Sequence, residues 1–245
     1  MPAARSHGST VMNMRRSASD STPHSRHLGL IGGLGVGATM VYYKAIAAGC
    51  IDRGKVPRIT VAHAHAPTVL AHVSEGPDAL AEYLAGFIRE LVAAETELLA
   101  IPAVTPHIAI DRLRRESPLP IIDMLAASGQ RLRDRGLTRI ALFGTRITIE
   151  TECFGALGPV EVVAPQRHET SEIDRIYHEL ATNGRTSDAN TETLRRVARA
   201  ICARDRVQAI VLAGTDLNLI FDESSAGFPA VDCTAAHVDA ILDHL

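Results

Sequence analysis

Two stretches of the chain share one design, in which an apolar run leads into a turn that carries a threonine. The two stretches cover residues 97–107 and 208–218. The first turn holds Thr105 and His107, and the second holds Thr215 and Asp216. Hydroxyl groups beside backbone N–H groups can hold an anion, whereas an imidazole or a carboxylate can carry a proton. The two turns therefore predict a site for acid binding and proton transfer.

The same two stretches indicate an internal repeat. Their best alignment places Ala103 opposite Gly214. Two glycines that end other apolar runs, Gly33 and Gly144, are separated by the same offset, because 144 − 33 equals 214 − 103. A shared offset is typical of a duplicated unit, so we expect two similar halves.

Strands that alternate with amphipathic helices are predicted to position these turns. The expected strands are 28–31, 58–62, 98–101, 121–122, 140–143, 160–163 and 209–212. The expected helices are 41–51, 78–95, 123–133, 172–181, 191–203 and 234–245. This alternation predicts an α/β fold of two pseudo-symmetric, doubly wound parallel-sheet lobes. Because loops at the carboxyl ends of parallel strands line a crevice, we expect the site in a cleft between the lobes.

Three blocks of sequence resemble the aspartate/glutamate racemase superfamily. The blocks are GGLGVGAT at 32–39, PAVTPH at 102–107 and AGTD at 213–216. They are similar to the family's Gly-Gly-Met-Gly-Pro-x-Ala-Thr, Pro-Cys-Asn-Thr-Ala-His and Gly-Cys-Thr-Glu, and the resemblance spans residues 28–245. Both family cysteines are substituted in this chain, by Ala103 and Gly214.

The family that this chain resembles uses two cysteine thiols for catalysis, and the resemblance implies that this chain would need other groups to transfer the proton. In the family, two thiols move a proton between opposite faces of the substrate. Ala103 and Gly214 carry no proton, so isomerisation or elimination by one general acid or base is easier to accommodate than racemisation. His107 matches the histidine of the family's first cysteine block and is the favoured proton carrier, although it can equally cap a helix. Asp216 replaces the family's glutamate, and its expected duty is orientation or stabilisation of a helix start.

A small carboxylic or amino acid is the expected ligand, held without a cofactor or metal. The predicted binding residues are Gly33, Gly35, Thr39, Thr105, Gly144, Thr145, Arg146, Thr148 and Thr215. Arg146 would offer a guanidinium for a second carboxylate, or it is a solvated surface residue. An alternative is a catalytically inactive homologue that still binds a carboxylate.

A second alternative is a metal-dependent hydrolase or lyase. His63 and His65 end an expected strand, and its two-residue period places both rings on one face. With His72, His107 or Asp216 they could bind a divalent metal. The plainer interpretation is a pair of polar histidines near the cleft.

The four cysteines are scattered, which favours reduced thiols in the cytoplasm over a disulfide framework. They are Cys50, Cys153, Cys202 and Cys233. Cys153 and Cys233 are remote candidates for a relocated catalytic thiol, and buried core positions are the simpler interpretation.

Composition restricts the partners. The 245 residues carry a formal charge of −3 and no Trp, so neither nucleic acid nor an anionic membrane is an expected partner. The predicted organisation is a disordered tail at 1–26, a first lobe at 27–136 and a second lobe at 137–222. The Ser- and Arg-rich tail lacks a secretory signal, and an organelle transit peptide is its less favoured interpretation. The resemblance further implies that residues 223–245 return to the first lobe and that the chain can pair as a homodimer.

Overall fold

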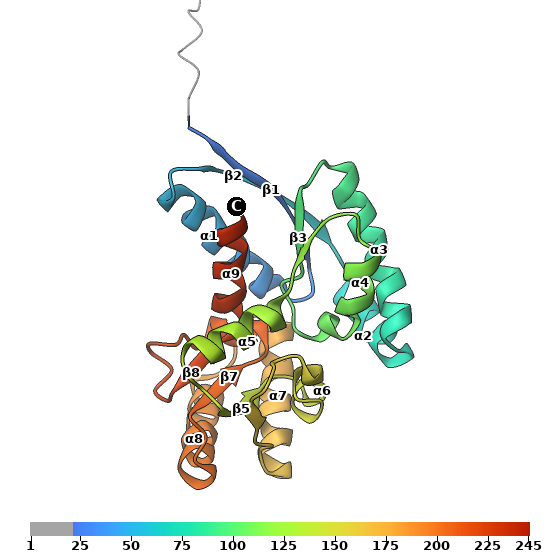
Figure 1. The fold of residues 1–245 in the computed structure, drawn as a ribbon. Helices are drawn as coiled ribbons and strands as arrows, with labels where there is room; N and C mark the ends of the chain where they lie inside the picture. The colour runs from blue at the N-terminus through green and yellow to red at the C-terminus, as the bar shows by residue number, and fades with distance from the viewer. Residues whose placement is uncertain (1–21) are drawn as a thin grey trace, which may run out of the picture.

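The computed structural model describes residues 22–245 and contains two parallel sheets (Figure 1). The first sheet has the order β2-β1-β3-β4. Its strands are β1 (His24–Gly32), β2 (Val56–His63), β3 (Leu98–Ala100) and β4 (Ile121–Ile122). Both neighbours of β1 pair with it in parallel, and β4 pairs in parallel with β3. The buried run of β1 includes Leu28, Leu30 and Ile31, as expected for a strand with helices on both faces.

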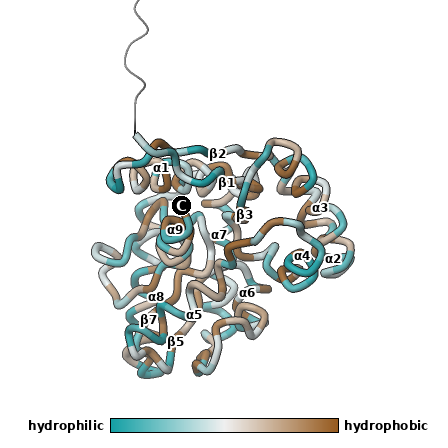
Figure 2. Tube along the Cα trace, turned by 45° about the horizontal axis from the view of Figure 1, so that its top comes forward, coloured by the Kyte–Doolittle hydropathy of each residue, from teal (hydrophilic) through white to brown (hydrophobic). Residues whose placement is uncertain are grey.

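Helices on both sides cover the first sheet. They are α1 (Val36–Asp52), α2 (Ala66–Glu75), α3 (Pro77–Ala93), the short 3-10 helix η1 (Thr105–Ala109) and α4 (Ile110–Glu116). α3 begins with Pro77 and buries Leu80, Leu84, Ile88 and Leu91, the stripe expected of an amphipathic helix. α1 is apolar along much of its length (Figure 2) and leaves Val36, Met40 and Tyr43 exposed.

The second sheet repeats the first in the order β6-β5-β7-β8. Its strands are β5 (Arg139–Phe143), β6 (Glu161–Val162), β7 (Ala209–Leu212) and β8 (Ala230–Asp232). The helical elements of this lobe are α6 (Arg146–Glu150), η2 (Cys153–Gly155), α7 (Arg167–Asn183), α8 (Asp188–Asp205) and η3 (Thr215–Leu219). The fold is therefore the predicted pair of pseudo-symmetric α/β lobes.

Two helices join the lobes. α5 (Met124–Asp134) follows β4, α9 (Cys233–His244) follows β8, and the two pack against each other (Figure 1). Asp123 and Asp232 cap these helices by accepting backbone N–H groups of the first turn, which satisfies donors that a helix start leaves unpaired. α9 also packs on α1, and one continuous core includes buried residues of both sheets.

A buried hydrogen-bond chain fixes α9 against the first lobe. The Tyr42 hydroxyl on α1 lies 3.0 Å from His237 Nδ1, and His237 Nε2 lies 2.9 Å from the Ile122 carbonyl oxygen. Nε2 has to donate to the carbonyl, so in a neutral ring Nδ1 accepts from the tyrosine. Burial lowers the pKa of His237 to about 3, in agreement with a neutral ring.

The internal repeat changes its offset between strand and turn. The equivalent strand bonds run from Leu99 N to Pro120 O and from Ile210 N to Pro229 O, and their donors keep the offset of the alignment, since 210 − 99 equals 214 − 103. The helices η1 and η3 begin at Thr105 and Thr215, which is a smaller offset. The first lobe thus has one extra residue before its turn. Ala103 matches Gly214 by strand register, whereas the turn geometry matches Val104 with Gly214.

The predicted segment boundaries differ from the structure at two places. Most of the predicted tail, residues 1–21, lies outside the described residues, but β1 already begins at His24 and Ser25 is buried. At the other end, β8 pairs with β7, so the second lobe extends past the predicted boundary at 222. Only α9 returns to the first lobe. Within residues 22–245, no helix combines the length and apolarity needed to cross a membrane.

Candidate active site between the lobes

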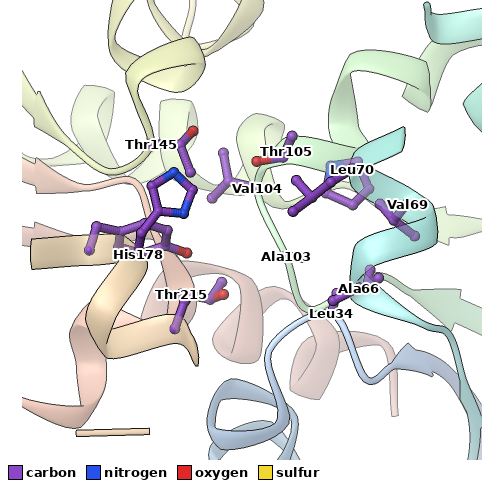
Figure 3. A pocket seen from close by; sticks show the side chains of 13 residues that line it. Leu34, Ala66, Val69, Leu70, Ala103, Val104, Thr105, Thr145, His178 and Thr215 are labelled. Carbon is purple, nitrogen blue, oxygen red and sulfur yellow. The ribbon is translucent and has the colours of Figure 1, made fainter. Parts of the chain in front are cut away.

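A cavity of about 80 Å³ lies between the lobes, at the carboxyl ends of β3, β5 and β7. Its polar lining residues are Thr105, Thr145, Tyr177, His178 and Thr215. Figure 3 shows Thr145, His178 and Thr215 of the second lobe on one side and Thr105 facing them from the first lobe. The two Thr-bearing turns singled out in the sequence therefore meet at one cavity.

The opposite wall of the cavity is apolar. It is formed by Leu34, Ala66, Val69, Leu70 and Val104 of the first lobe (Figure 3). Three of these side chains come from α2. The lining residues found within 22–245 include no Lys, Arg, Asp or Glu. A ligand would therefore meet hydroxyl groups and the imidazole of His178 on one side and hydrocarbon on the other.

The glycine-rich turn after β1 supports the cavity from behind. Gly33 has φ +82°, and a Cβ there would lie 2.3 Å from the Ala64 carbonyl oxygen. Thr39 Oγ1 accepts from Gly33 N at 3.0 Å and donates to the Gly35 carbonyl at 2.9 Å. These three predicted binding residues hold the turn together, and the residue they present to the cavity is Leu34.

The equivalent turn of the second lobe presents Thr145. A Cβ on Gly144 would lie 2.4 Å from the Ala213 carbonyl oxygen, so only glycine permits this close approach of β5 and β7. Thr145 Oγ1 accepts from Thr148 N at 3.3 Å and lies 2.8 Å from Thr148 Oγ1. Thr145 lines the cavity, while Thr148 is buried and orients it.

Arg146 lies in an outer depression and does not line the cavity. Its backbone N–H donates to Asp174 at 2.6 Å, and its guanidinium lies 3.5 Å from Glu150. Arg146 is therefore not placed to bind a second carboxylate inside the cleft, as the sequence had predicted.

His107 faces the core and is absent from the cavity lining. Its Nδ1 lies 2.8 Å from the Ala103 carbonyl oxygen, and its Nε2 accepts from Met124 N at 3.2 Å. Both nitrogens are thus used by backbone groups, and burial lowers the pKa of the ring. This geometry argues against the predicted proton-transfer role and favours the alternative, in which His107 joins η1 to the start of α5.

Asp216 lies where the two lobes touch. It is 2% exposed, and a Cβ on Gly35 would lie 2.6 Å from its Oδ2. Its carboxylate therefore faces the start of α1, where Ala38 N–H stabilises the ionised form. Burial outweighs this bond and raises the pKa of Asp216 to about 6. Among its described neighbours, the Tyr177 hydroxyl is 3.5 Å from Oδ2, and Oδ1 has no protein partner.

The two positions expected to hold cysteines have different surroundings. Ala103 lines the cavity directly. At Gly214, a Cβ would lie 2.3 Å from Tyr177 Cε2 and 2.9 Å from Cδ2 and Cζ. The tyrosine ring thus occupies the space that a side chain at position 214 would need.

Neither candidate for a relocated thiol reaches the cavity. Cys153 and Cys233 are fully buried in the main core and are absent from the cavity lining. Burial raises the pKa of Cys233 to about 12 and that of Cys153 well above its usual value. A thiol that stays protonated and buried is core packing, not a base.

The histidines of the metal hypothesis have separate partners. His65 Nδ1 lies 2.8 Å from Thr68 Oγ1, and His72 Nδ1 lies 3.0 Å from Glu75 Oε2. No group of three or more His, Cys, Asp or Glu side chains suited to a metal occurs in residues 22–245. The metal-dependent alternative consequently has no cluster to support it.

Sequence reasoning missed Tyr177, His178 and the contribution of α2. Tyr177 and His178 lie on the helix predicted for residues 172–181, where their spacing indicates only one amphipathic face. The sequence signal that points to Tyr177 is Gly214, because a missing side chain at a strand end leaves room for a large neighbour. A glycine at position 214 does not, however, identify which residue occupies the space beside it.

Two parallel sheets, the helices α5 and α9 that join the lobes, and a cavity between the lobes define a two-lobed α/β protein of the racemase type. The Asp/Glu/hydantoin racemase family model matches residues 31–241, so the chain belongs to that family.

Solved structures from other organisms share the fold. An aspartate racemase homologue from Pyrococcus horikoshii is 24% identical with a TM-score of 0.75, covering 89% of this chain and 98% of its own. The aspartate racemase of Picrophilus torridus is 19% identical with a TM-score of 0.71, over 90% and 100% of the two chains. A glutamate racemase from Francisella tularensis in complex with D-glutamate is 14% identical with a TM-score of 0.60, over 89% and 80%.

Proposed function

We propose that this chain is an enzyme that binds a small carboxylic or amino acid between its lobes and transfers a proton without a cysteine. The observation that carries the proposal is the meeting of three threonines from separate turns at one interlobe cavity. Each stands where a strand of one of the sheets ends, at the crevice where parallel sheets bind ligands.

The hydroxyl groups supply a neutral anion site. Thr105, Thr145 and Thr215 can each donate one hydrogen bond to a carboxylate oxygen. Charge-assisted bonds of this kind are stronger than neutral ones, and more so in a buried cavity of low polarity. The same donors would stabilise the enediolate that forms when a carboxylate loses a proton from its neighbouring carbon.

Size and polarity restrict the ligand further. Ligand pockets commonly enclose about 300–1,000 Å³, whereas this cavity encloses about 80 Å³. The apolar wall and the absence of Lys and Arg from the lining among the described residues favour one carboxylate with a small apolar substituent over a dicarboxylate. Leu34, Val69 and Leu70 would contact that substituent.

The reaction we favour is isomerisation or elimination, with racemisation less favoured. Ala103 and Gly214 provide no proton carrier on either side, so a matched pair of thiols is not available. Chemistry with one proton-transfer group and an anion site needs no second base.

We also propose a cytoplasmic location for the protein. Its four cysteines are free thiols, which supports this proposal.

Hydrogen exchange in deuterium oxide tests the proposal. The protein is incubated with L-alanine, L-aspartate, maleate, methylmalonate and L-lactate, and deuterium incorporation and new products are followed by NMR and mass spectrometry. We expect incorporation or bond rearrangement with at least one acid, and stronger thermal stabilisation by monocarboxylates than by L-aspartate. Stabilisation without exchange or product would instead support the non-catalytic binding homologue.

A matched pair of variants locates the site. Thr145→Val removes a cavity hydroxyl with little change in shape. It should weaken binding of the acid that stabilises the unmodified protein most by at least tenfold, the equivalent of about 1.4 kcal/mol. Thr193→Val, on the distant helix α8, should bind like the unmodified protein. Equal affinities of both variants would refute this cavity as the binding site.

A further inference from the structure

Tyr177 stands where the side chain of residue 214 would otherwise lie. Its ring atoms Cε2, Cδ2 and Cζ lie 2.3–2.9 Å from the Cβ that any residue other than glycine would place at position 214. Tyr177 also lines the cavity, and its side chain comes from α7, opposite the apolar wall. Gly214 has no side chain that could transfer a proton, and the space beside it is filled by Tyr177, whose hydroxyl could do so.

The tyrosine hydroxyl is paired with a carboxylate. It donates to Asp216 Oδ2 over 3.5 Å, and both residues are at most 9% exposed. The bond is long for O–H···O geometry, and catalytic hydrogen bonds are often long before a substrate is bound. From α1 the Ala38 N–H faces the carboxylate, and the titratable group that interacts with it is Tyr177.

We propose that Tyr177 and Asp216 form a proton relay for the substrate in the cavity, taking the part that a side chain at position 214 would otherwise play. This inference rests on the proposed function. In the forward step the carbon–hydrogen bond next to the substrate carboxylate breaks, and the proton passes to the phenol oxygen. The phenol's own proton passes at the same time to the ionised Asp216 carboxylate. The electron pair remains on the substrate as an enediolate, which the cavity threonines stabilise.

The relay leaves the phenol neutral before and after the step. Burial and the neighbouring Asp216 raise the pKa of Tyr177 far above its usual value, so a free phenolate is not the base. Asp216 is the final acceptor, and its pKa of about 6 makes it a stronger base than an ordinary aspartate while leaving it ionised at neutral pH. Reversal of the same transfers returns the proton to a different carbon in an isomerisation.

The variants Tyr177→Phe and Tyr43→Phe test the relay. Tyr177→Phe keeps the ring that fills the space beside Gly214 and removes the hydroxyl. Tyr43→Phe makes the same change on the exposed face of α1, outside the cavity. Deuterium incorporation is measured with the five acids above, and binding is measured by thermal stabilisation.

The expected result is a loss of at least 100-fold in the exchange rate for Tyr177→Phe, with binding retained and with Tyr43→Phe unchanged. The exchange rate of the unmodified protein should rise with pH through about 6, the pKa of Asp216, and level off about one unit higher, where Asp216 is largely ionised. Asp216→Asn should lose this rise and exchange at least 100-fold more slowly. If Tyr177→Phe fails to fold, as judged by far-ultraviolet circular dichroism, the Asp216→Asn profile decides the question.

Three outcomes overturn the relay, and only the third also refutes the proposed function. Exchange by Tyr177→Phe at the unmodified rate, or an Asp216→Asn profile with the original rise near pH 6, would leave the proposed function standing and refute the relay. Failure of the unmodified protein to exchange hydrogen with any of the five acids would refute both the proton-transfer function and the relay.

Discussion

Replacing Gly214 by alanine is the most direct test of the packing that defines this site. The substitution adds one methyl group at a position whose φ of −149° suits any residue, so the backbone is not strained. The added carbon would lie 2.3 Å from Tyr177 Cε2. Atoms at van der Waals contact are about 3.5–4.0 Å apart, so the ring has to move by more than about 1 Å or the β7 turn has to shift.

The expected cost follows from two opposing contributions. Forcing an extra methyl group into a packed interior costs about 1–3 kcal/mol. Replacing glycine by alanine also removes freedom from the unfolded chain, which stabilises the folded protein by about 0.4–1 kcal/mol. Tyr177 is 9% exposed and packs within the main core, so it has little room to rotate. We therefore expect Gly214→Ala to lower the free energy of unfolding by about 1–2 kcal/mol.

Urea denaturation followed by circular dichroism measures this change. Gly86→Ala on α3 is the matched control, because the nearest atom to its new Cβ is Arg89 Nη2 at 3.8 Å. That variant should be more stable by about 0.5–1 kcal/mol, as expected for alanine in a helix. Adding Tyr177→Ala should abolish the penalty of Gly214→Ala in a double-mutant cycle. If Gly214→Ala alone is as stable as Gly86→Ala, the assignment of the Tyr177 ring to this space is wrong.

The remaining predictions concern buried polar groups. Asp216→Asn should raise the free energy of unfolding at pH 7.5 by up to about 3 kcal/mol, since the raised pKa of about 6 makes ionisation costly in the folded state. This advantage should shrink as the pH falls through 6 and vanish below about 4, and an advantage that grows on acidification would contradict it. Tyr42→Phe leaves His237 Nδ1 without its donor and should cost about 1–3 kcal/mol in urea denaturation, whereas a neutral effect would mean that this bond does not fix α9. His107→Phe unpairs Ala103 O and Met124 N and should lower the midpoint of thermal unfolding. If His107→Phe folds, it should still exchange substrate hydrogen, and complete loss of exchange in a folded variant would restore the proton-transfer role first expected of His107.

Hydrophobic patterning was sufficient to predict most strands of the two sheets. The seven expected strands correspond to β1 to β7, because continuous apolar runs such as 140–143 read as strands buried on both faces. Residues 228–231 were strand-like in the sequence but were not assigned to the second sheet, since β8 (Ala230–Asp232) is short and follows a loop without periodicity. It also missed α2, whose only fully buried residue is Val69. Elements that bury little leave a weak periodic signal.

The candidate site was predictable where local sequence determines it. A threonine in the turn that follows a buried strand lies near the carboxyl edge of a parallel sheet, so Thr105, Thr145 and Thr215 were expected to meet, and they do line one cavity. Gly33, Thr39 and Thr148 were predicted to bind the ligand. In the structure they shape the turns without lining the cavity.

The sequence by itself determined the family and the two α/β lobes. Tertiary structure decided which titratable groups line the cavity. His107 follows Thr105 in the same turn, yet backbone groups use both of its nitrogens, whereas Tyr177 on α7 and Gly214 after β7 come together although all of α8 separates them along the chain. Local propensity and periodicity act over one or two turns of chain, while the contents of a cavity depend on contacts between elements that only packing brings together.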